Sequence, residues 1–594
     1  MLIMDQPEMD LMLPLEMGQH DGLHSMRYQT EASFLTKEEL TRQLENLLHQ
    51  PIGSVQDLED WLYKESDLSA KIEEMVAWVF INFKRNHQDE EAQRRYDYVN
   101  RHILPLLEKY GHRLDKKVVD SPYVSQLDQK RFGRLIQSKK NAVQLYADEE
   151  IPLQIKEQEL IKQYNEIMGG LTVKWEGKEL TFQEMQKLLE DKKREVREKA
   201  FRAMWNRVLE EEEELNQIMT QLVKIRHQIA QNAGFENFRD YMYQKYERYD
   251  YTPEDSQRLY QAVKEHVVPV MDQLQKEHQE GLGLSDYKPW DVSVQATSKP
   301  PLTPFQDVGQ LVEGTVKILE RVDPVFADVL RQLDQEGLLD LENRSGKSPG
   351  GFCSSLPVTG LSFIFMNATG TPRDVTTLIH EGGHAVHNFL MQRQPLAAYR
   401  SADKEAAELA SMGMELLTMD QWSVFYSDEE SLRQAQLEHL QKILTFFPWA
   451  MVVDQFQHWM YENPNHTAEE RKLKFLELSR EMSHHGVDTR GIDHFLAVRW
   501  MLQPHIFEVP FYYIEYVIAQ LGALELWQDY QQDPEATITR FKQALSLGSS
   551  ASLPEVYEYA GLHFDLSEAR LKRLITHLHH SIESLKGRTV TLSE

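Results

Sequence analysis

Apolar residues recur along most of the chain at spacings of three and four positions, which is the period of an amphipathic α-helix. One long stretch that ends near residue 232 repeats them in this way: Phe201, Met204, Trp205, Val208 and Leu209. Comparable patterns predict several helices within residues 37–166 and a last helix at about residues 567–586. Strand-like patterns occur in a small hairpin around Gly177 and in a run at residues 361–367. The chain is therefore predicted to be mainly α-helical, with little β structure.

The pattern changes most clearly near the middle of the chain. Leu361–Asn367 is a short, mostly apolar run, which predicts a buried or half-buried strand. Soon after it, Thr371 is a good N-cap, Pro372 suits the first helical position, and Asp374 follows the cap by three residues. A well-started helix is therefore expected from about Pro372 to Leu390.

This helix carries the sequence His380-Glu381-Gly382-Gly383-His384, an HExxH motif. Positions i and i+4 of a helix lie on the same face, so the two imidazoles can hold one zinc ion while the glutamate reaches a water on the metal. The strand followed by a capped helix is the arrangement of zincin-type metallopeptidases. The motif in this setting predicts a metallopeptidase site.

A catalytic zinc site needs a third protein ligand and an open position. A second helix is expected to start near Asp403, and its Glu405, Glu408 and Glu415 share one side because spacings of three and seven nearly return to the same face. Glu408 is the predicted third ligand, with Glu405 and Glu415 as candidates for orienting the ligand histidines. His387 is expected to be packed or hydrogen-bonded instead of binding the metal.

The two glycines of the motif each cost roughly 1 kcal/mol of helix propensity relative to alanine. We expect them to allow close backbone approach, either by the glutamate helix or by a bound substrate. A further hypothesis is that the strand at Leu361–Asn367 has a free edge, to which a peptide substrate adds as an extra strand.

Together with a later segment, these motifs resemble the thimet oligopeptidase and oligoendopeptidase F family of zinc peptidases. The later segment, Pro504–Tyr516, is similar to the family's pattern of a histidine followed by tyrosines. The resemblance covers roughly residues 200–580. It implies a large two-lobed, α-rich fold with a small β-sheet beside the active-site helix, and a deep channel that admits short peptides.

The resemblance also implies roles for individual residues. One Zn2+ ion would be held by His380, His384 and Glu408, and Glu381 would be the general base. Donors around the scissile carbonyl would be His505, Tyr513 and Tyr516, although which tyrosine stabilises the oxyanion stays open. Tyr513 and Tyr516 fall on one face of an expected helix. Tyr512 is expected to point elsewhere and to be structural.

Composition narrows the class of partner and the compartment. With 65 basic and 94 acidic residues the formal net charge is −29, which argues against nucleic acid or an anionic membrane as partner. A single cysteine, Cys353, precludes an intrachain disulfide and favours a reducing compartment. The first residues lack the pattern of a signal peptide, and no apolar run approaches about 18 residues. A cytoplasmic enzyme is predicted.

The sequence predicts a zinc-dependent endopeptidase that hydrolyses internal bonds of short peptides. A zinc carboxypeptidase or dipeptidyl carboxypeptidase is the alternative among enzymes, and a non-catalytic helical peptide-binding protein is the alternative outside them. We expect a polar N-terminal segment at residues 1–32, an N-terminal helical region at 33–200 and a catalytic zinc-peptidase region at 201–594. The oligomeric state stays open.

Overall fold

The computed structural model describes residues 36–587 except residues 297–300, 349 and 484. The polar segment expected at residues 1–32 lies outside these residues, and the division of the remaining chain near residue 200 stays a prediction. None of the described helices is both long and apolar enough to cross a membrane.

The N-terminal helices bury a hydrophobic cluster of their own, which includes Leu58, Trp61 and Phe132. Polar caps set where these helices begin: the Ser54 side chain accepts a hydrogen bond from the Asp57 amide at the start of α3. The helices are α2 (Lys37–His49), α3 (Val55–Arg85), α4 (Glu90–Tyr98), α5 (Leu104–Val119) and α6 (Gln129–Leu145), with the π-helical turn η1 (Val99–Ile103) between α4 and α5.

The expected hairpin around Gly177 is present, with β1 (Thr172–Trp175) antiparallel to β2 (Lys178–Thr181). Gly177 has φ +83°, a left-handed conformation that glycine adopts without strain. The helical stretch expected up to residue 232 is two helices that are separated at Glu211. The helices of this part are α7 (Ile151–Gly169), α8 (Phe182–Leu188), α9 (Arg194–Glu210), α10 (Glu212–Asn232), α11 (Phe238–Lys245), α12 (Pro253–His266) and α13 (Val268–Leu282).

A three-stranded sheet contains the strand that was expected upstream of the helix with the HExxH motif. Its order is β3 (Leu339–Glu342), β5 (Leu361–Ala368), β4 (Phe352–Leu356), with β3 parallel and β4 antiparallel to β5. The prediction of a free edge at residues 361–367 is therefore wrong, because β5 pairs with a strand on each side. The first six residues of β5 are all buried, as in a strand covered on both faces, whereas most of β4 is half-buried.

The helix after β5 is α16 (Pro372–Met391), as expected from its capping residues. The Asp374 carboxylate accepts hydrogen bonds from the Thr371 amide and hydroxyl, which closes the helix entry. α16 packs between β5 and α17 (Lys404–Thr418), and α17 packs in turn against α22 (Tyr513–Tyr530). These three helices form the centre of the main hydrophobic core.

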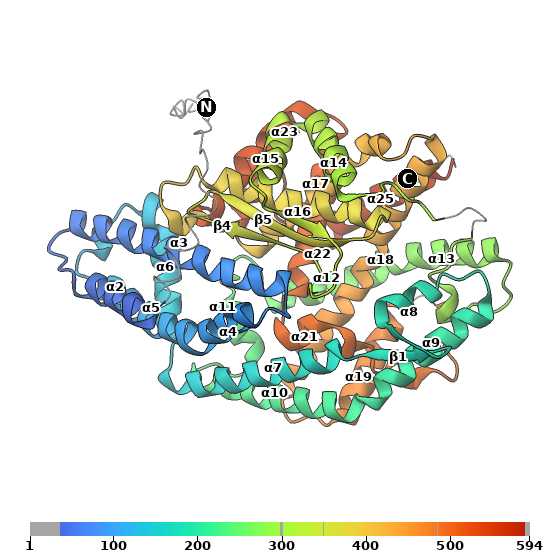
Figure 1. The fold of residues 1–594 in the computed structure, drawn as a ribbon, viewed down its shortest axis with the longest axis horizontal. Coiled ribbons are helices and arrows are strands. Elements are labelled where there is room, and N and C mark those ends of the chain that lie inside the picture. The colour runs from blue at the N-terminus through green and yellow to red at the C-terminus, as the bar shows by residue number, and fades with distance from the viewer. Residues whose placement is uncertain (1–35, 297–300, 349, 484, 588–594) are drawn as a thin grey trace.

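The remaining helices surround this centre. They are α14 (Val308–Val322), α15 (Pro324–Gln335), α18 (Glu429–Glu462), α19 (Ala468–Glu481), α20 (Asp493–Leu496), α21 (Pro504–Glu508), α23 (Pro534–Leu545), α24 (Leu553–Tyr559) and α25 (Glu568–Leu585). Figure 1 shows a mainly α, two-lobed body with the sheet, α14–α17 and α23 in its upper half, and α7 and α10 along its lower edge. The N-terminal helices α2–α5 lie at the left, and α18 runs between the two halves.

The two glycines of the HExxH motif have different surroundings. A Cβ added to Gly383 would lie 2.6 Å from the Cα of Ser411 and 2.8 Å from the carbonyl oxygen of Ala410, both backbone atoms of α17. A Cβ on Gly382 would meet nothing within 4 Å. Close approach by the glutamate helix is therefore confirmed for Gly383, and Gly382 faces open space.

These surroundings predict opposite effects of the same substitution. Gly383→Ala must push α16 and α17 apart, so it should lower the free energy of unfolding by about 1–3 kcal/mol. Gly382→Ala is the matched control and should raise that free energy by up to about 1 kcal/mol through helix propensity. Urea unfolding of both metal-free variants measures the difference, and equal effects of the two would contradict the close contact at Gly383.

Candidate active site

Two helices bring together the three predicted metal ligands. His380 and His384 lie one turn apart on α16, and Glu408 faces them from α17. The Glu408 Oε2 atom is 3.5 Å from His380 Nε2 and 3.8 Å from His384 Nε2, and one ligand atom of each residue lies within 4.8 Å of the others. Tetrahedral ligands at roughly 2.0–2.2 Å from zinc lie about 3.3–3.6 Å apart, so this donor set fits the ion.

The two carboxylates that were expected to orient the ligand histidines, Glu415 and Glu405, have different hydrogen-bond partners. Glu415 Oε1 accepts a hydrogen bond of 2.7 Å from His380 Nδ1, which leaves Nε2 of that imidazole to face the centre. The orienting role expected for Glu405 is wrong, because its Oε1 accepts from the Tyr251 hydroxyl at 2.6 Å. Glu405 lies about 60° around α17 from Glu408, whereas Glu415 lies only about 20° away.

Glu408 is held by its own contacts as well. Its Oε2 accepts from the Ser411 hydroxyl at 3.2 Å and its Oε1 from the Tyr512 hydroxyl at 3.2 Å. Burial by itself raises the pKa of Glu408, but His380, His384 and Tyr512 outweigh burial and lower it to about 2. Glu408 is therefore ionised and can offer its carboxylate to a cation.

Glu381 is buried on α16 beside the ligands, and burial raises its pKa to about 7. The backbone just before β4 lies next to it: a Cβ on Gly351 would be 3.6 Å from Glu381 Oε1. No described strand pairs with the outer side of β4. The glutamate thus faces a glycine loop and the unpaired edge of the sheet.

His505 lies at the start of α21, in a hydrogen-bonded chain with defined donors. The Trp449 indole N–H donates to Gln503 Oε1 at 3.3 Å, so the Gln503 amide nitrogen faces His505 Nδ1, at 2.7 Å. Because an amide nitrogen only donates, Nδ1 accepts and the imidazole proton is on Nε2. Burial lowers the pKa of His505 to about 4, so this ring is a neutral Nε2–H donor.

The three tyrosines of the segment are grouped around His505 but have different partners. The Tyr513 hydroxyl donates to Gln503 Oε1 at 3.2 Å, and the Tyr512 hydroxyl donates to Glu408. The Tyr516 ring packs against both, with centroid distances of 5.0 Å to Tyr512 and 5.6 Å to Tyr513. The expectation that Tyr512 points elsewhere is wrong, because its hydroxyl touches a predicted metal ligand.

Two buried arginines hold the segment that carries His505 and Tyr512. Arg226 of α10 donates to the carbonyl oxygens of Ile506 and Phe507. Arg248 donates at 2.6 Å to the carbonyl of Phe511, which has φ +66°, and at 2.6 Å to Glu515. The left-handed conformation at Phe511 turns the chain just before α22 and is rare for a bulky residue.

A cavity of about 1180 Å³ approaches this site at Trp449, although no predicted site residue lines it. One face of α18 forms a wall of it, from Glu430 to Val452 at helical spacing. Trp449 belongs to this wall and also bonds Gln503, so the cavity reaches the residues that contact His505.

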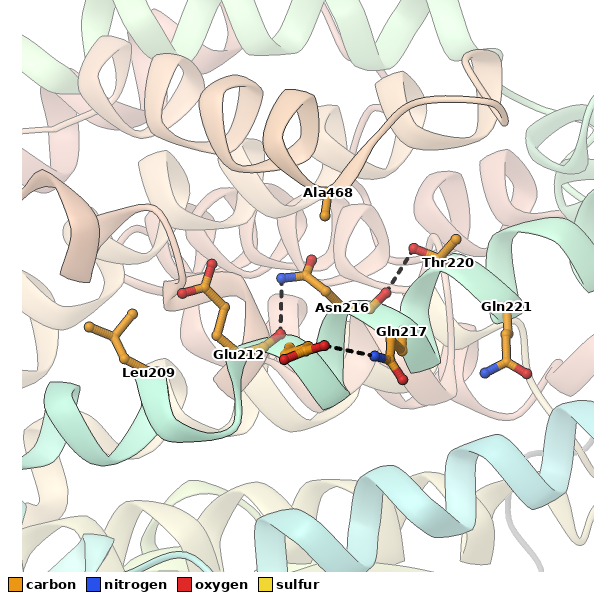
Figure 2. Close-up of a pocket in the computed structure, with 8 residues that line it drawn as sticks. Leu209, Glu212, Asn216, Gln217, Thr220, Gln221 and Ala468 are labelled. Carbon is orange, nitrogen blue, oxygen red and sulfur yellow. Dashed lines mark hydrogen bonds between the residues drawn. The ribbon is translucent and has the colours of Figure 1, made fainter.

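A smaller hollow of about 560 Å³ lies on α10, opposite the start of α19 (Figure 2). Its polar side chains have partners within α10, where Asn216 donates to the Glu212 carbonyl, Gln217 to Glu213 and Thr220 to the Asn216 carbonyl. They also have partners on α19, where Arg471 donates to Asn216 and Thr220 and Lys472 pairs with Glu212. Neither hollow is lined by a predicted site residue, but the lining of the larger one includes Trp449, which belongs to the hydrogen-bonded chain that ends at His505. We therefore assign the chemistry to the larger cavity and the centre beside it.

Comparisons with known proteins agree with this geometry. The model of "Peptidase family M3" matches residues 187–575, and that of "Peptidase M3 N-terminal domain" matches residues 28–146. The chain belongs to peptidase family M3. The structure of this M3 peptidase resembles that of PZ peptidase A with an inhibitor, at a TM-score of 0.86 and 27% identity, over 92% of this chain and 97% of that one.

Curated relatives of this M3 peptidase are more distant in sequence. Oligoendopeptidase F (plasmid) of Lactococcus lactis subsp. cremoris is 22% identical over 508 residues, which are 79% of this chain and 77% of that protein. Group B oligopeptidase PepB of Streptococcus agalactiae is 24% identical over 444 residues, which are 70% of this chain and 65% of that protein. The resemblance stated from the motifs is thereby confirmed.

His387 is buried, as expected.

Several other residues of this M3 peptidase were not found from its sequence. The sequence did not indicate Gln503, Trp449 or Arg248. Each of these residues forms a hydrogen bond with a residue that is distant in sequence or that lies in a turn. One local signal was available: Gln503 stands two positions before His505, so its amide can reach back to the imidazole.

The Gln503 contact predicts the tautomer of His505. Gln503→Glu puts an acceptor at Nδ1, so the imidazole proton should move from Nε2 to Nδ1. Gln503→Leu removes the partner and should leave a mixture of both tautomers. The 15N chemical shifts of the His505 ring at pH 7 measure the proton position. A ring that keeps its proton on Nε2 in both variants would show that Gln503 does not set it.

Proposed function

We propose that this M3 peptidase is a zinc-dependent endopeptidase that hydrolyses internal bonds of short peptides. The observation that carries the proposal is the set of three ligand atoms from His380, His384 and Glu408, together with the buried carboxylate of Glu381 on the same helix as the two histidines. Structural zinc sites are usually closed by four protein ligands, whereas catalytic sites keep an open position. This argues against the non-catalytic alternative.

His380, His384 and Glu408 would hold one Zn2+ ion, with Glu415 fixing the His380 ring. When bound there, the ion supplies a Lewis acid that acidifies a water and polarises the scissile carbonyl. Glu381 then has the position of a general base: it takes a proton from the attacking water and passes it to the leaving amine.

The developing oxyanion needs hydrogen-bond donors that do not ionise at neutral pH. The Nε2–H of His505 is such a donor, and burial raises the pKa of the Tyr516 hydroxyl, which keeps it protonated. Tyr513 is the second proposed tyrosine donor, although its hydroxyl bonds Gln503 in this structure. Of these two tyrosines, Tyr516 is the one proposed here as the oxyanion donor.

Endopeptidase action is supported by the size of the cavity. A volume of about 1180 Å³ beside the centre has room for several residues of an extended peptide. The unpaired edge of β4 next to Glu381 offers main-chain groups to such a peptide, in place of the edge first expected on β5. A cytoplasmic location is also proposed, and it rests on the single cysteine of the sequence.

Glu381→Gln tests the proposed base. The variant should keep zinc, since the three ligands are intact, and its rate of peptide hydrolysis should fall by roughly 10²–10⁴-fold. Zinc content and hydrolysis are measured on the same sample. Glu438→Gln is the matched control, because it makes the same change on the cavity wall, where Gln295 and Gln434 bond the carboxylate. Hydrolysis that survives with zinc bound to the Glu381 variant would refute the mechanism.

Peptides blocked at both ends separate the endopeptidase from the carboxypeptidase alternatives. We expect the zinc-loaded enzyme to cleave an N-acetylated, C-amidated peptide of about ten residues at internal bonds, because β4 and the cavity recognise extended chain. Mass spectrometry of the products locates the cleaved bonds. Cleavage only of peptides with a free C-terminus, one or two residues from that end, would instead establish the exopeptidase.

A further inference from the structure

The cavity lining includes three basic side chains, Arg433, Lys442 and Arg499, of which Lys442 has the Glu415 carboxylate nearby as a counter-charge. None of them makes a hydrogen bond or ion pair with a described residue. The lining also includes the acidic side chains of Glu190, Glu430 and Glu438, and the last of these is satisfied by the amides of Gln295 and Gln434. In a chain of net charge −29, uncompensated cations inside a cavity require an explanation.

Arg499 is the most confined of the three. It begins the 3-10 turn η7 (Arg499–Leu502), it is half-buried, and its guanidinium lies 4.7 Å from the centroid of the Trp449 ring. Burial lowers the pKa of Arg499, and no described acid counteracts this effect. A confined cation without an anionic partner is costly, and an anionic ligand offsets that cost.

Arg499 is also connected to the catalytic residues. Trp449, over which it stacks, donates to Gln503, and Gln503 donates to His505. Arg433 is different: it stands 16 positions before Trp449 on α18, which places it roughly 24 Å away along the helix axis. Arg499 is thus linked to His505 through Trp449 and Gln503, and Arg433 is remote from Trp449.

We propose that Arg499 is a substrate-binding residue that pairs with a carboxylate of the bound peptide. A guanidinium presents a planar fork of donors that matches a carboxylate, and the Trp449 ring holds that fork in one plane. The carboxylate comes either from the C-terminus of the peptide or from an Asp or Glu side chain. This assignment rests on the proposed peptidase function and adds to it a preference for acidic peptides.

Peptides made in pairs test the assignment and separate the two sources of the carboxylate. One pair differs by a free or an amidated C-terminus, and the other pairs differ by Glu or Gln at successive positions. Affinity is measured calorimetrically on the zinc-loaded Glu381→Gln protein, and kcat/KM is measured on the active enzyme. We expect the acidic member of at least one pair to bind about tenfold or more tightly.

Substitutions then assign this preference to a residue. Arg499→Gln should abolish the preference, and Arg499→Lys should retain part of it, because a charge remains without the planar fork. Arg433→Gln is the matched control: it removes an equal charge from the same cavity and should preserve the preference.

Equal affinities within every pair, or a preference that survives Arg499→Gln, would overturn the assignment. The affinities of the paired peptides for the protein with Arg499 intact decide whether a preference for the acidic peptide exists, even if a variant fails to fold. An Arg499-dependent affinity in a protein that hydrolyses no peptide would support this binding site and count against the proposed function.

Discussion

The backbone contact between α16 and α17 is the constraint on which the site depends. Gly383 has no side chain, so α17 approaches until the Ser411 Cα and the Ala410 carbonyl occupy the space of a Cβ. That approach brings Glu408 within 3.5–3.8 Å of the two imidazoles, although its helix is separate in sequence. A side chain at residue 383 would move Glu408 away from His380 and His384, although none of these three residues would itself be changed.

The second half of the site is positioned from outside the α16–α17 pair. His505 and Tyr512 lie at either end of a short segment whose carbonyl groups bond Arg226 and Arg248. The amide of Phe511 also donates to Gln457 of α18. Buried arginines are costly to desolvate, so here their role is best understood as fixing the short helix α21 and the turn that follows it. The polar donors therefore have a defined place relative to the metal ligands.

Much of the candidate metal centre follows from local sequence. The capping residues, the four-residue histidine spacing and Glu408 depend only on helical geometry, which a few residues determine. The order of strands does not: β5 lies between β3 and β4, and nothing within residues 361–367 indicates that both its edges are paired. Tyr512 was misplaced for a related reason. It is the N-cap of α22 and follows a left-handed residue, so helical spacing did not apply to it.

One wall of the cavity is a single helix of 34 residues, and this has a consequence for how relatives of the enzyme diverge. Positions of α18 that face the cavity recur every three or four residues, while the positions between them pack into the core. A substitution at one of the cavity positions alters the lining at one depth and leaves the metal ligands, which belong to other helices, in place. Substrate preference can thus change through single substitutions along the helix while the chemistry stays the same.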